Sequence, residues 1–374
     1  MKTVIFAGGG TGGHLYPALA LGAALHELDP ALRVHYVGAK RGVETRVLPA
    51  HGVAHTLLPL QPIQRAQVWR NWRLLPGTIG TLFGLTRLFL RLRPKLVVGT
   101  GGYASGPAAF WAVLTAVPVA VQEQNSHPGL TTRLLSRFAR QVHLGFPEAE
   151  QKLKPGRRTR VFALGNPIRP PDETLDRHAC RQRFGLSADA VVLLVVGGSQ
   201  GARAVNEGLL RALENVAQGR DAQRPEKLEI LWATGPAHID AVSARLAPLA
   251  LSWVHATGYI DAMPEALAAT DVAVSRAGAM ATAELLAWGR PMLLVPLPTA
   301  AADHQTHNAR ALAEAGAAVM IEERTLTPER LWREVVALTG DAARREAMQH
   351  AAQARARPHA AREIARHLQS LIAA

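Results

Sequence analysis

Two glycine-rich turns constrain the fold of this chain more than any other feature. The first, at residues 8–14, directly follows an apolar run at 3–7, and the second, at 197–202, directly follows another at 191–196. Such an uninterrupted apolar run is typical of a parallel strand that is buried on both faces. Glycines let the backbone approach a ligand, and the helix that follows offers unpaired N–H groups to an anion. The two turns therefore predict two nucleotide-binding α/β domains with a cleft between them.

The rest of the chain alternates between predicted strands and helices. Strands are expected near residues 3–7, 33–37, 54–58, 95–99, 117–121, 141–145 and 160–164, and then near 191–196, 228–233, 252–256, 271–274, 292–296 and 317–321. This alternation predicts an α/β fold with two doubly wound parallel sheets. We expect an N-terminal domain over residues 1–164 and a C-terminal domain over 165–354, joined at the proline-rich segment 165–171. An arginine-rich terminal helix, at about 355–374, is expected to pack back on the first domain.

Length and composition fit a cytosolic protein. A chain of 374 residues can form two cores of ordinary size, and its one cysteine, Cys180, excludes an internal disulfide. Because Met1 and Lys2 lead straight into the first predicted strand, we expect no cleavable secretory leader. The charge-free stretch 96–122 contains glycines and prolines that divide it into strand, loop, helix and strand. We therefore expect no membrane span there.

The net charge of +13 is concentrated in the first half of the chain. Residues 1–164 hold 20 of the 42 lysines and arginines but only 6 of the 29 acids, a net charge of +14, so the remainder carries −1. Between Glu44 and Glu123 there are eight basic residues and no acidic one. A basic surface favours an anionic partner, which is a bilayer or a nucleic acid. No recognised nucleic-acid motif accompanies the charge, so we expect no nucleic-acid partner.

Apolar side chains alternate with these cations around residues 76–77, which we interpret as a loop leading into an amphipathic helix. Aromatic rings and arginines together favour the boundary of an anionic bilayer, where rings sink and guanidinium groups meet phosphates. The residues expected to face the membrane, here called the membrane patch, are Trp69, Trp72, Ile79 and Phe83. Alternatively, the apolar residues are only the buried face of the helix and the arginines its solvated face. That alternative accounts less well for residues in or beside the loop.

The first turn also fits the G-x-G-x-x-G pattern of dinucleotide enzymes. That pattern requires an acid at the end of the second strand to hold the adenosine ribose. Here the strand is followed by Lys40 and Arg41, without an acid, which weakens an NAD-dependent enzyme and leaves a phosphorylated cofactor open. A better ribose partner is Glu284, in the helix that follows the small-residue turn after strand 271–274. A plain surface glutamate is the alternative for that residue.

Six motifs occur in a fixed order along the chain. They are Gly-Gly-Thr-Gly-Gly-His at 9–14, Gly-Gly-Tyr-x-Ser-Gly-Pro at 101–107, Glu-Gln-Asn at 123–125, Gly-Asn-Pro-Ile-Arg at 165–169, Gly-Gly-Ser-Gln-Gly-Ala at 197–202 and Asp-His-Gln-x-x-Asn at 303–308. Together they closely resemble the MurG family of peptidoglycan N-acetylglucosaminyltransferases, in glycosyltransferase family 28. The resemblance implies the GT-B fold, in which two Rossmann-like domains face each other across a cleft. It also implies UDP-N-acetylglucosamine as the donor, membrane-bound lipid I as the acceptor and lipid II as the product.

The resemblance assigns roles to individual residues. Those implied to bind UDP-N-acetylglucosamine are Thr11, Gly12, Gly13, Asn125, Arg169, Ser199, Gln200, Gly201, Ile260, Ala279, Met280, Glu284, His304 and Gln305. Among them, the backbone near Ile260 would meet uracil, and Glu284 would meet the ribose. Ser199 and its turn would hold phosphate. Gln305, with His304, would reach the sugar hydroxyls, and Asn125 would approach from the acceptor side.

The implied chemistry is attack by the C4 hydroxyl of the acceptor on the anomeric carbon, with inversion and departure of UDP. It requires a base at the hydroxyl and donors at the leaving phosphates. His14 is the candidate base because imidazole accepts a proton near neutral pH, and Glu123 is the reserve. Alternatively, His14 only orients the turn or the acceptor's phosphates. No Asp-x-Asp occurs in the chain, so we expect neither a metal nor another cofactor, with helix N-termini and Arg169 neutralising the diphosphate.

Three functions stay open on the sequence. The first is the family's transferase, acting as a peripheral protein at the cytoplasmic face of the membrane on UDP-N-acetylglucosamine and lipid I. The second is a relative with a similar two-domain shape, either a transferase for a diacylglycerol acceptor or a nucleotide-sugar epimerase. The third is a non-catalytic basic scaffold. The enzymes predict a preference for uridine nucleotides, and the scaffold predicts none.

Overall fold

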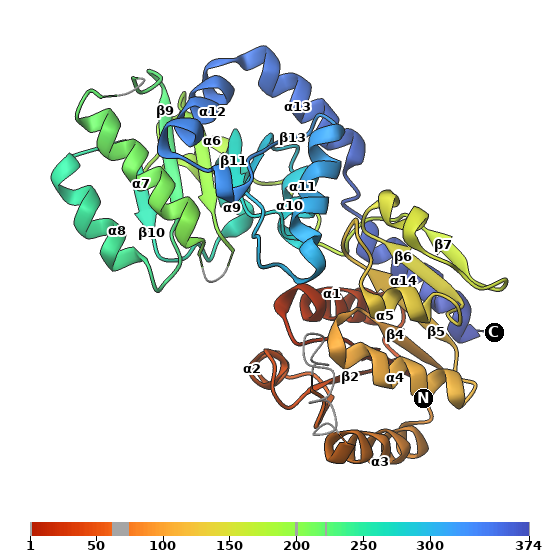
Figure 1. Cartoon of the computed structure of the whole chain (residues 1–374). Helices are drawn as coiled ribbons and strands as arrows, with labels where there is room; N and C mark the ends of the chain where they lie inside the picture. The colour runs from red at the N-terminus through yellow and green to blue at the C-terminus, as the bar shows by residue number, and fades with distance from the viewer. Residues whose placement is uncertain (1, 62–74, 199–200, 221–222, 374) are drawn as a thin grey trace. The chain divides into compact units, whose positions relative to one another are not determined.

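The chain forms two compact units, as shown by the computed structural model, which describes residues 2–61, 75–198, 201–220 and 223–373 (Figure 1). Unit 1 comprises Met1–Arg169 together with Pro358–Ala374, and unit 2 comprises Pro170–Arg357. The chain therefore leaves unit 1 immediately before Pro170 and re-enters it at Pro358. The first of these crossings falls within the proline-rich segment 165–171.

Unit 1 is built on a seven-stranded parallel sheet in the order β3-β2-β1-β4-β5-β6-β7. Its strands are β1 (Thr3–Ala7), β2 (Arg33–Ala39), β3 (His55–Leu58), β4 (Leu96–Gly99), β5 (Val119–Glu123), β6 (Gln141–Leu144) and β7 (Arg160–Phe162). Every residue of β1, β4 and β5 is buried, which explains why these strands are apolar runs rather than alternating patterns. The strand order reverses between β1 and β4, and in open parallel sheets ligands bind at the carboxyl ends of the strands where the order reverses.

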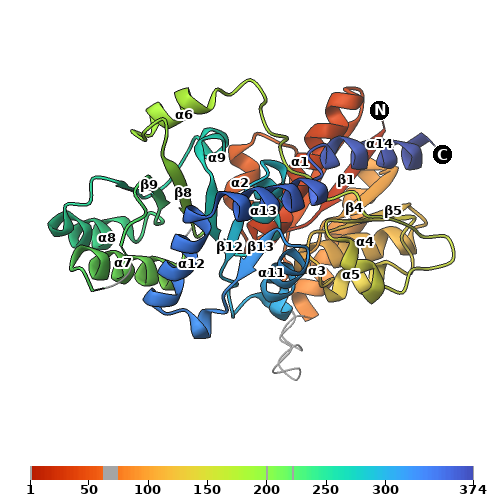
Figure 2. The ribbon, with the colours of Figure 1, turned by 90° about the horizontal axis from the view of Figure 1, so that it is seen from above.

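Helices cover both faces of this sheet. The helices of unit 1 are α1 (Gly12–Leu28), α2 (Glu44–Ala50), α3 (Leu75–Leu92), α4 (Gly102–Leu114), α5 (Leu130–Leu135), the 3₁₀ helix η2 (Pro147–Lys152) and α14 (Ala360–Ala373). One core lies under α1 and α14, which pack together, and the other lies under α3, α4 and α5. Helix α14 is tied to the sheet because Gln141 Nε2 donates to the carbonyl of His367 (3.1 Å). In Figure 2, α14 runs beside α1 near both chain termini.

Unit 2 repeats the design with six parallel strands in the order β10-β9-β8-β11-β12-β13. The strands are β8 (Val191–Val196), β9 (Leu228–Ala233), β10 (Val254–Thr257), β11 (Val272–Ser275), β12 (Met292–Leu294) and β13 (Ala318–Met320). The helices are α6 (Arg177–Arg183), α7 (Arg203–Ala217), α8 (Ile239–Leu246), α9 (Met263–Ala269), α10 (Ala279–Ala287), α11 (His304–Glu314), α12 (Pro328–Gly340) and α13 (Ala342–Arg355), with 3₁₀ turns η3 (Ala247–Leu249), η4 (Ala301–Asp303) and η5 (Glu323–Thr325). Again the order reverses at a neighbouring pair, here β8 and β11.

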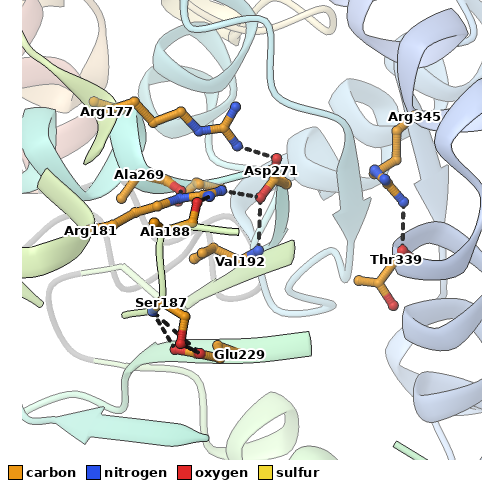
Figure 3. Close-up of polar contacts among 12 residues, drawn as sticks. Arg177, Arg181, Ser187, Ala188, Val192, Glu229, Ala269, Asp271, Thr339 and Arg345 are labelled. Carbon is orange, nitrogen blue, oxygen red and sulfur yellow. Dashed lines mark hydrogen bonds and ion pairs between the residues drawn. The ribbon is translucent and has the colours of Figure 1, made fainter. Parts of the chain in front are cut away.

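A polar network closes the amino-terminal edge of the unit 2 sheet (Figure 3). Asp271, just before β11, accepts hydrogen bonds from the Val192 amide (2.8 Å) and from Arg181 Nη2 (2.7 Å), and it also pairs with Arg177. Glu229 of β9 accepts from the Ser187 amide (3.2 Å). These bonds fix the strand starts, which leaves the opposite edge, where the strands end, for the candidate site.

The predicted secondary structure is confirmed with one correction. All thirteen predicted strands are present with bounds within two residues of those expected, and the stretch 96–122 is β4, α4 and β5. The loop predicted around residues 76–77 is wrong, because α3 begins at Leu75 and Ile79 lies within it. Proline fits the first turn of a helix, where its missing N–H would have had no helical partner. Among the helices within the described ranges, none is long and apolar enough to cross a membrane.

Candidate functional site

A cavity of about 710 Å³ lies in unit 2 where β8 and β11 end. It is lined by the glycine turn after β8, the loop after β11, the segment after β12, and side chains of α7, α10 and α11. Among the lining residues are Gly197, Gly198, Gly201, Arg203, Ser275, Arg276, Gly278, Ala281, Leu297, Thr299 and Gln305. In open parallel sheets the reversal of strand order is the place where ligands bind. The cavity therefore lies where the motif at 197–202 and the motif at 303–308 both contribute lining residues.

Two helices begin at this cavity. The N-cap residues, Ala202 for α7 and Gly278 for α10, provide no side-chain hydrogen bond to the helix start. A helix start leaves backbone N–H groups without intrahelical partners and carries about half a positive charge, so two of them favour an anion. Gly201 has φ +76°, and a Cβ there would overlap the carbonyl of Thr234. Only glycine therefore lets the turn run this close to β9.

Glu284 lies on α10, one turn beyond the cavity-lining Ala281. Burial raises the pKa of its carboxyl group from 4.5 to about 7. Its carboxylate forms no hydrogen bond or ion pair with the residues that the structure describes. A desolvated and unpaired carboxylate is costly to keep, and such groups gather at functional sites. The raised pKa favours a functional role for Glu284 over the plain surface glutamate that was its alternative.

The segment after β12 presents Gln305 to the cavity. Its Oε1 accepts from the Leu297 amide (3.0 Å), which leaves Nε2 without a hydrogen bond to any described residue. His304 Nδ1 lies 2.6 Å from the carbonyl of Ala301 in the preceding 3₁₀ turn. Gln305 thus lies at the cavity wall, whereas one ring nitrogen of His304 contacts the backbone of the preceding turn.

The other predicted donor residues are spread over both units. Ala279 and Met280 are the first residues of α10. Ile260 is buried in the segment after edge strand β10, whereas Arg169 is exposed at the end of unit 1. Ser199 and Gln200 lie outside the described residues. The remaining four, Thr11, Gly12, Gly13 and Asn125, belong to unit 1.

Unit 1 repeats the arrangement where β1 and β4 end. Helix α1 begins at Gly12, with Thr11 as N-cap, and α4 begins at Gly102, with Gly101 as N-cap at φ +95°. A Cβ on Gly101 would lie 2.7 Å from Nδ1 of His14, and one on Gly102 would overlap the carbonyl of Gly9. The two helix starts therefore approach the first turn closely because these positions are glycines.

His14 and Glu123 differ in what holds them. His14 Nδ1 lies 2.9 Å from Oε1 of Gln124, and its Nε2 forms no hydrogen bond with the described residues. The buried carboxylate of Glu123 accepts from the Asn125 amide (3.1 Å) and side chain (3.2 Å) and from the Gly129 amide (3.0 Å). Both oxygens of Glu123 are thus engaged in holding its own loop, whereas His14 has a free ring nitrogen.

The sequence analysis missed Glu44. This side chain is fully buried, and its Oε1 accepts from the amides of Gly10 (2.8 Å) and Ala39 (3.1 Å). The carboxylate absent from the end of β2 is thus supplied from the start of α2, and it holds the glycine turn. The sequence signal was an isolated acid in a basic segment, just after Gly42.

Arg276 lies in the loop after β11, and the sequence analysis gave it no role. It donates to the carbonyls of Val295 (3.1 Å) and Pro296 (3.2 Å) and pairs with Glu323 (2.6 Å). It therefore joins three of the segments at the cavity.

Two residues of the membrane patch are exposed on α3. Ile79 is 67% and Phe83 70% exposed, while Trp69 and Trp72 lie outside the described residues. The opposite side of α3 is buried in the core. The alternative interpretation, in which the apolar residues are only the buried face of this helix, therefore fits that side but not the exposed Ile79 and Phe83. Further exposed apolar residues on the same layer of helices are Leu82, Leu90, Phe110, Leu114, Leu130 and Leu134. Monomeric proteins seldom leave many apolar side chains of one layer in water.

Comparison with known proteins identifies the family. Residues 4–144 match the glycosyltransferase family 28 N-terminal domain, and residues 192–364 match its C-terminal domain. The chain is 42% identical over 369 residues to a protein of Moorella thermoacetica, covering 96% of both chains, and 41% identical over 370 residues to one of Chlorobaculum parvum, covering 97% of both. Both relatives are named UDP-N-acetylglucosamine–N-acetylmuramyl-(pentapeptide) pyrophosphoryl-undecaprenol N-acetylglucosamine transferase. The crystal structure of Acinetobacter baumannii MurG is similar with a TM-score of 0.77 and 29% identity, covering 99% of this chain and 100% of that one. The chain therefore belongs to glycosyltransferase family 28.

Proposed function

We propose that this protein transfers N-acetylglucosamine from UDP-N-acetylglucosamine to the C4 hydroxyl of the N-acetylmuramyl group of lipid I, forming lipid II for peptidoglycan synthesis. The observation that carries the proposal is the unit 2 cavity, where two helix starts lie near the half-buried carboxylate of Glu284, which has no partner among the described residues, in a chain 42% identical to a relative named for this activity. Two helix starts suit a diphosphate, and a carboxylate suits the adjoining ribose diol. That pair of features is the chemical outline of a nucleoside diphosphate sugar.

In the donor site, the diphosphate lies against the starts of α7 and α10, next to Gly201, Ala279 and Met280. Glu284 accepts hydrogen bonds from the ribose hydroxyls. Gln305 uses the nitrogen that has no described partner for a sugar hydroxyl. The other donor contacts belong to the same proposal: Ile260 at uracil, Ser199 and Gln200 at phosphate, His304 at the sugar, and Arg169 beside the nucleotide.

In unit 1, the acceptor lies at the starts of α1 and α4. Thr11, Gly12, Gly13 and Asn125 contact the donor from this edge of unit 1, and Asn125 is held there by Glu123. His14 Nε2 takes the proton of the C4 hydroxyl. The hydroxyl oxygen then bonds to the anomeric carbon as the bond from that carbon to UDP breaks, with inversion. Because both oxygens of Glu123 already accept hydrogen bonds, His14 is the better base. The leaving diphosphate is neutralised by helix starts and Arg169 without a metal.

The exposed apolar residues of α3 supply the membrane contact. A lipid-linked acceptor stays in its bilayer, so the enzyme must reach the bilayer surface. Ile79 and Phe83 present apolar surface on the basic unit, which suits the cytoplasmic face of an anionic membrane, with Trp69 and Trp72 included in the patch. The protein is then peripheral, with UDP-N-acetylglucosamine arriving from solution.

The test is transfer of radiolabel from UDP-N-acetylglucosamine to a short-chain lipid I analogue, with a diacylglycerol acceptor in parallel and an acceptor-free reaction. We expect label only in the lipid I analogue. Glu284→Ala should abolish transfer, whereas Glu314→Ala, at an exposed position on α11, should retain it. Label in diacylglycerol alone would instead support the transferase for a diacylglycerol acceptor. A chemically altered donor in the acceptor-free reaction would support the epimerase, and no transfer at all would support the scaffold.

A further inference from the structure

Three buried side-chain amides form a hydrogen-bonded chain in unit 1 that ends on His14. Gln122 belongs to β5, Gln124 directly follows that strand, and Asn166 lies just before the end of unit 1. Their exposed fractions are 0%, 1% and 3%. Gln122 Nε2 donates to Asn166 Oδ1 (3.1 Å), Gln124 Nε2 donates to Gln122 Oε1, and Gln124 Oε1 lies 2.9 Å from His14 Nδ1.

The orientation of each amide is fixed by a backbone carbonyl. Gln124 Nε2 faces the carbonyl of Thr100 (2.8 Å), Gln122 Nε2 faces that of Glu123 (3.3 Å), and Asn166 Nδ2 faces that of Gln124 (2.9 Å). A carbonyl oxygen can only accept a hydrogen bond, so each of these amide atoms must be the nitrogen. Turning any one of them over would bring two acceptors together in a buried place, at a cost of about 1–3 kcal/mol.

This direction determines where the His14 ring carries its proton. Because the atom of Gln124 that meets Nδ1 is an oxygen, Nδ1 must be the donor. In the neutral ring the lone pair is then on Nε2, which no described residue engages. Gly101 contributes from the other side, since a Cβ there would lie 2.7 Å from Nδ1 and 3.4 Å from Gln124 Oε1. Glycine thus leaves room for the bond that sets the tautomer.

We propose that Gln124 is a positioning residue for the transfer reaction. With Gln122 and Asn166 behind it, Gln124 holds His14 in the tautomer protonated at Nδ1, so that Nε2 can accept the proton of the acceptor hydroxyl. This inference rests on the proposed function, which makes His14 the base. Burying these amides costs little free energy because each is hydrogen-bonded. Their network also fixes one orientation of the side chains, which a purely apolar core would not do.

The first measurement is the tautomer itself, independent of turnover. In full-length protein labelled with [¹⁵N]histidine, the ring nitrogens of His14, assigned with His14→Gln, should show a proton on Nδ1 and none on Nε2. Gln124→Met, which keeps a similar volume without the acceptor, should lose this preference. The matched control is Gln141→Met, because Gln141 is also buried on this sheet and its Oε1 also contacts a histidine, His143 (3.1 Å). A proton on Nε2 of His14 in the wild type overturns the inference.

The second measurement is the transfer rate against pH. General-base catalysis contributes roughly 10²–10⁴-fold, so Gln124→Met should lower kcat by at least about 10²-fold with little change in the KM for donor. Gln124→Glu retains an acceptor at Nδ1, so it should recover part of the rate and move the acid limb of the profile to higher pH, because a carboxylate favours the charged imidazole. Gln141→Met should keep the wild-type rate.

Folding and function are separated in the same series. Donor binding by calorimetry does not depend on the tautomer of His14 and should be unchanged in Gln124→Met, while thermal unfolding reports on the whole chain. Wild-type rates in a Gln124→Met protein that has lost the tautomer would overturn the inference. If the wild type transfers nothing to the lipid I analogue, the proposed function fails instead, and the tautomer measurement stands on its own.

Discussion

Because the pKa of Glu284 is raised, we predict that donor binding depends on pH in a way that a single substitution removes. Only the ionised carboxylate can accept hydrogen bonds from both ribose hydroxyls, and burial raises its pKa to about 7 in the free protein. At pH 6 the protonated form then exceeds the ionised form about tenfold, and at pH 8 the ratio is reversed. Binding favours the ionised form, so affinity for UDP-N-acetylglucosamine should fall about tenfold, or about 1.4 kcal/mol, between pH 8 and pH 6.

Calorimetric titration at pH 6, 7 and 8 tests this dependence. UDP-N-acetylglucosamine is the better ligand than UDP, because its diphosphate has no terminal phosphate that titrates near pH 6. Glu284→Gln should bind more weakly at pH 8 by about 1.5–3 kcal/mol, the usual contribution of a hydrogen bond to a charged group, and should show no pH dependence over this range. Glu314→Gln should keep the wild-type slope. Equal wild-type affinity at pH 6 and pH 8, or a slope that persists in Glu284→Gln, would refute the reasoning.

Three further predictions concern stability, the membrane and metals. The folded protein binds the Glu284 proton more tightly than the unfolded chain does. The free energy of unfolding of the wild type should therefore decline by about 3 kcal/mol relative to that of Glu284→Gln as pH rises from 4.5 to about 7, and no further above that. Urea-unfolding free energies of the two proteins that change in parallel with pH across this window would contradict it. Replacing Ile79 and Phe83 with serine should weaken sedimentation with anionic vesicles at least about tenfold, while Tyr259→Ser, at an exposed aromatic of unit 2, should not; undiminished sedimentation would count against the patch. Transfer should continue in EDTA, and a loss that Mg²⁺ restores would show that a metal is required.

The sequence predicted the central strands well because they are short and buried on both faces. Such strands must be apolar, so β1 and β8 stand out as runs that glycines terminate. The same logic located both site edges, since the motifs follow strands that prove to be neighbours in the sheet. The start of α3 was misplaced because Pro76 and Gly77 usually mark turns, although proline is also favoured in a first helical turn.

Other site features could not be predicted, because they depend on partners that are distant in sequence. Asn166 lies 44 residues from Gln122, and nothing local pairs their amides. Gln124 stood inside a recognised motif, yet only its contacts with Thr100 and His14 indicate what it does. Glu44 is similar. The dinucleotide pattern places an acid at the end of β2, whereas here the acid that accepts from the Ala39 amide comes from the start of α2. A motif therefore identified where the site is, and the fold was required to say which atoms face each other.

The charges around the cavity indicate how unit 2, which holds 19 lysines and arginines and 22 acids for a net charge of −3, can bind a diphosphate. Two helix starts contribute together about one positive charge, roughly half of what a nucleotide sugar's diphosphate carries. Arg276 adds little, because Glu323 pairs with it at the cavity wall. Arg203, by contrast, lines the cavity without pairing with any described acid, at the first position of α7, where a cation opposes the helix dipole. An anion between the two helix starts would turn that unfavourable placement into a favourable one, so the position of Arg203 is itself an argument that the cavity binds phosphate.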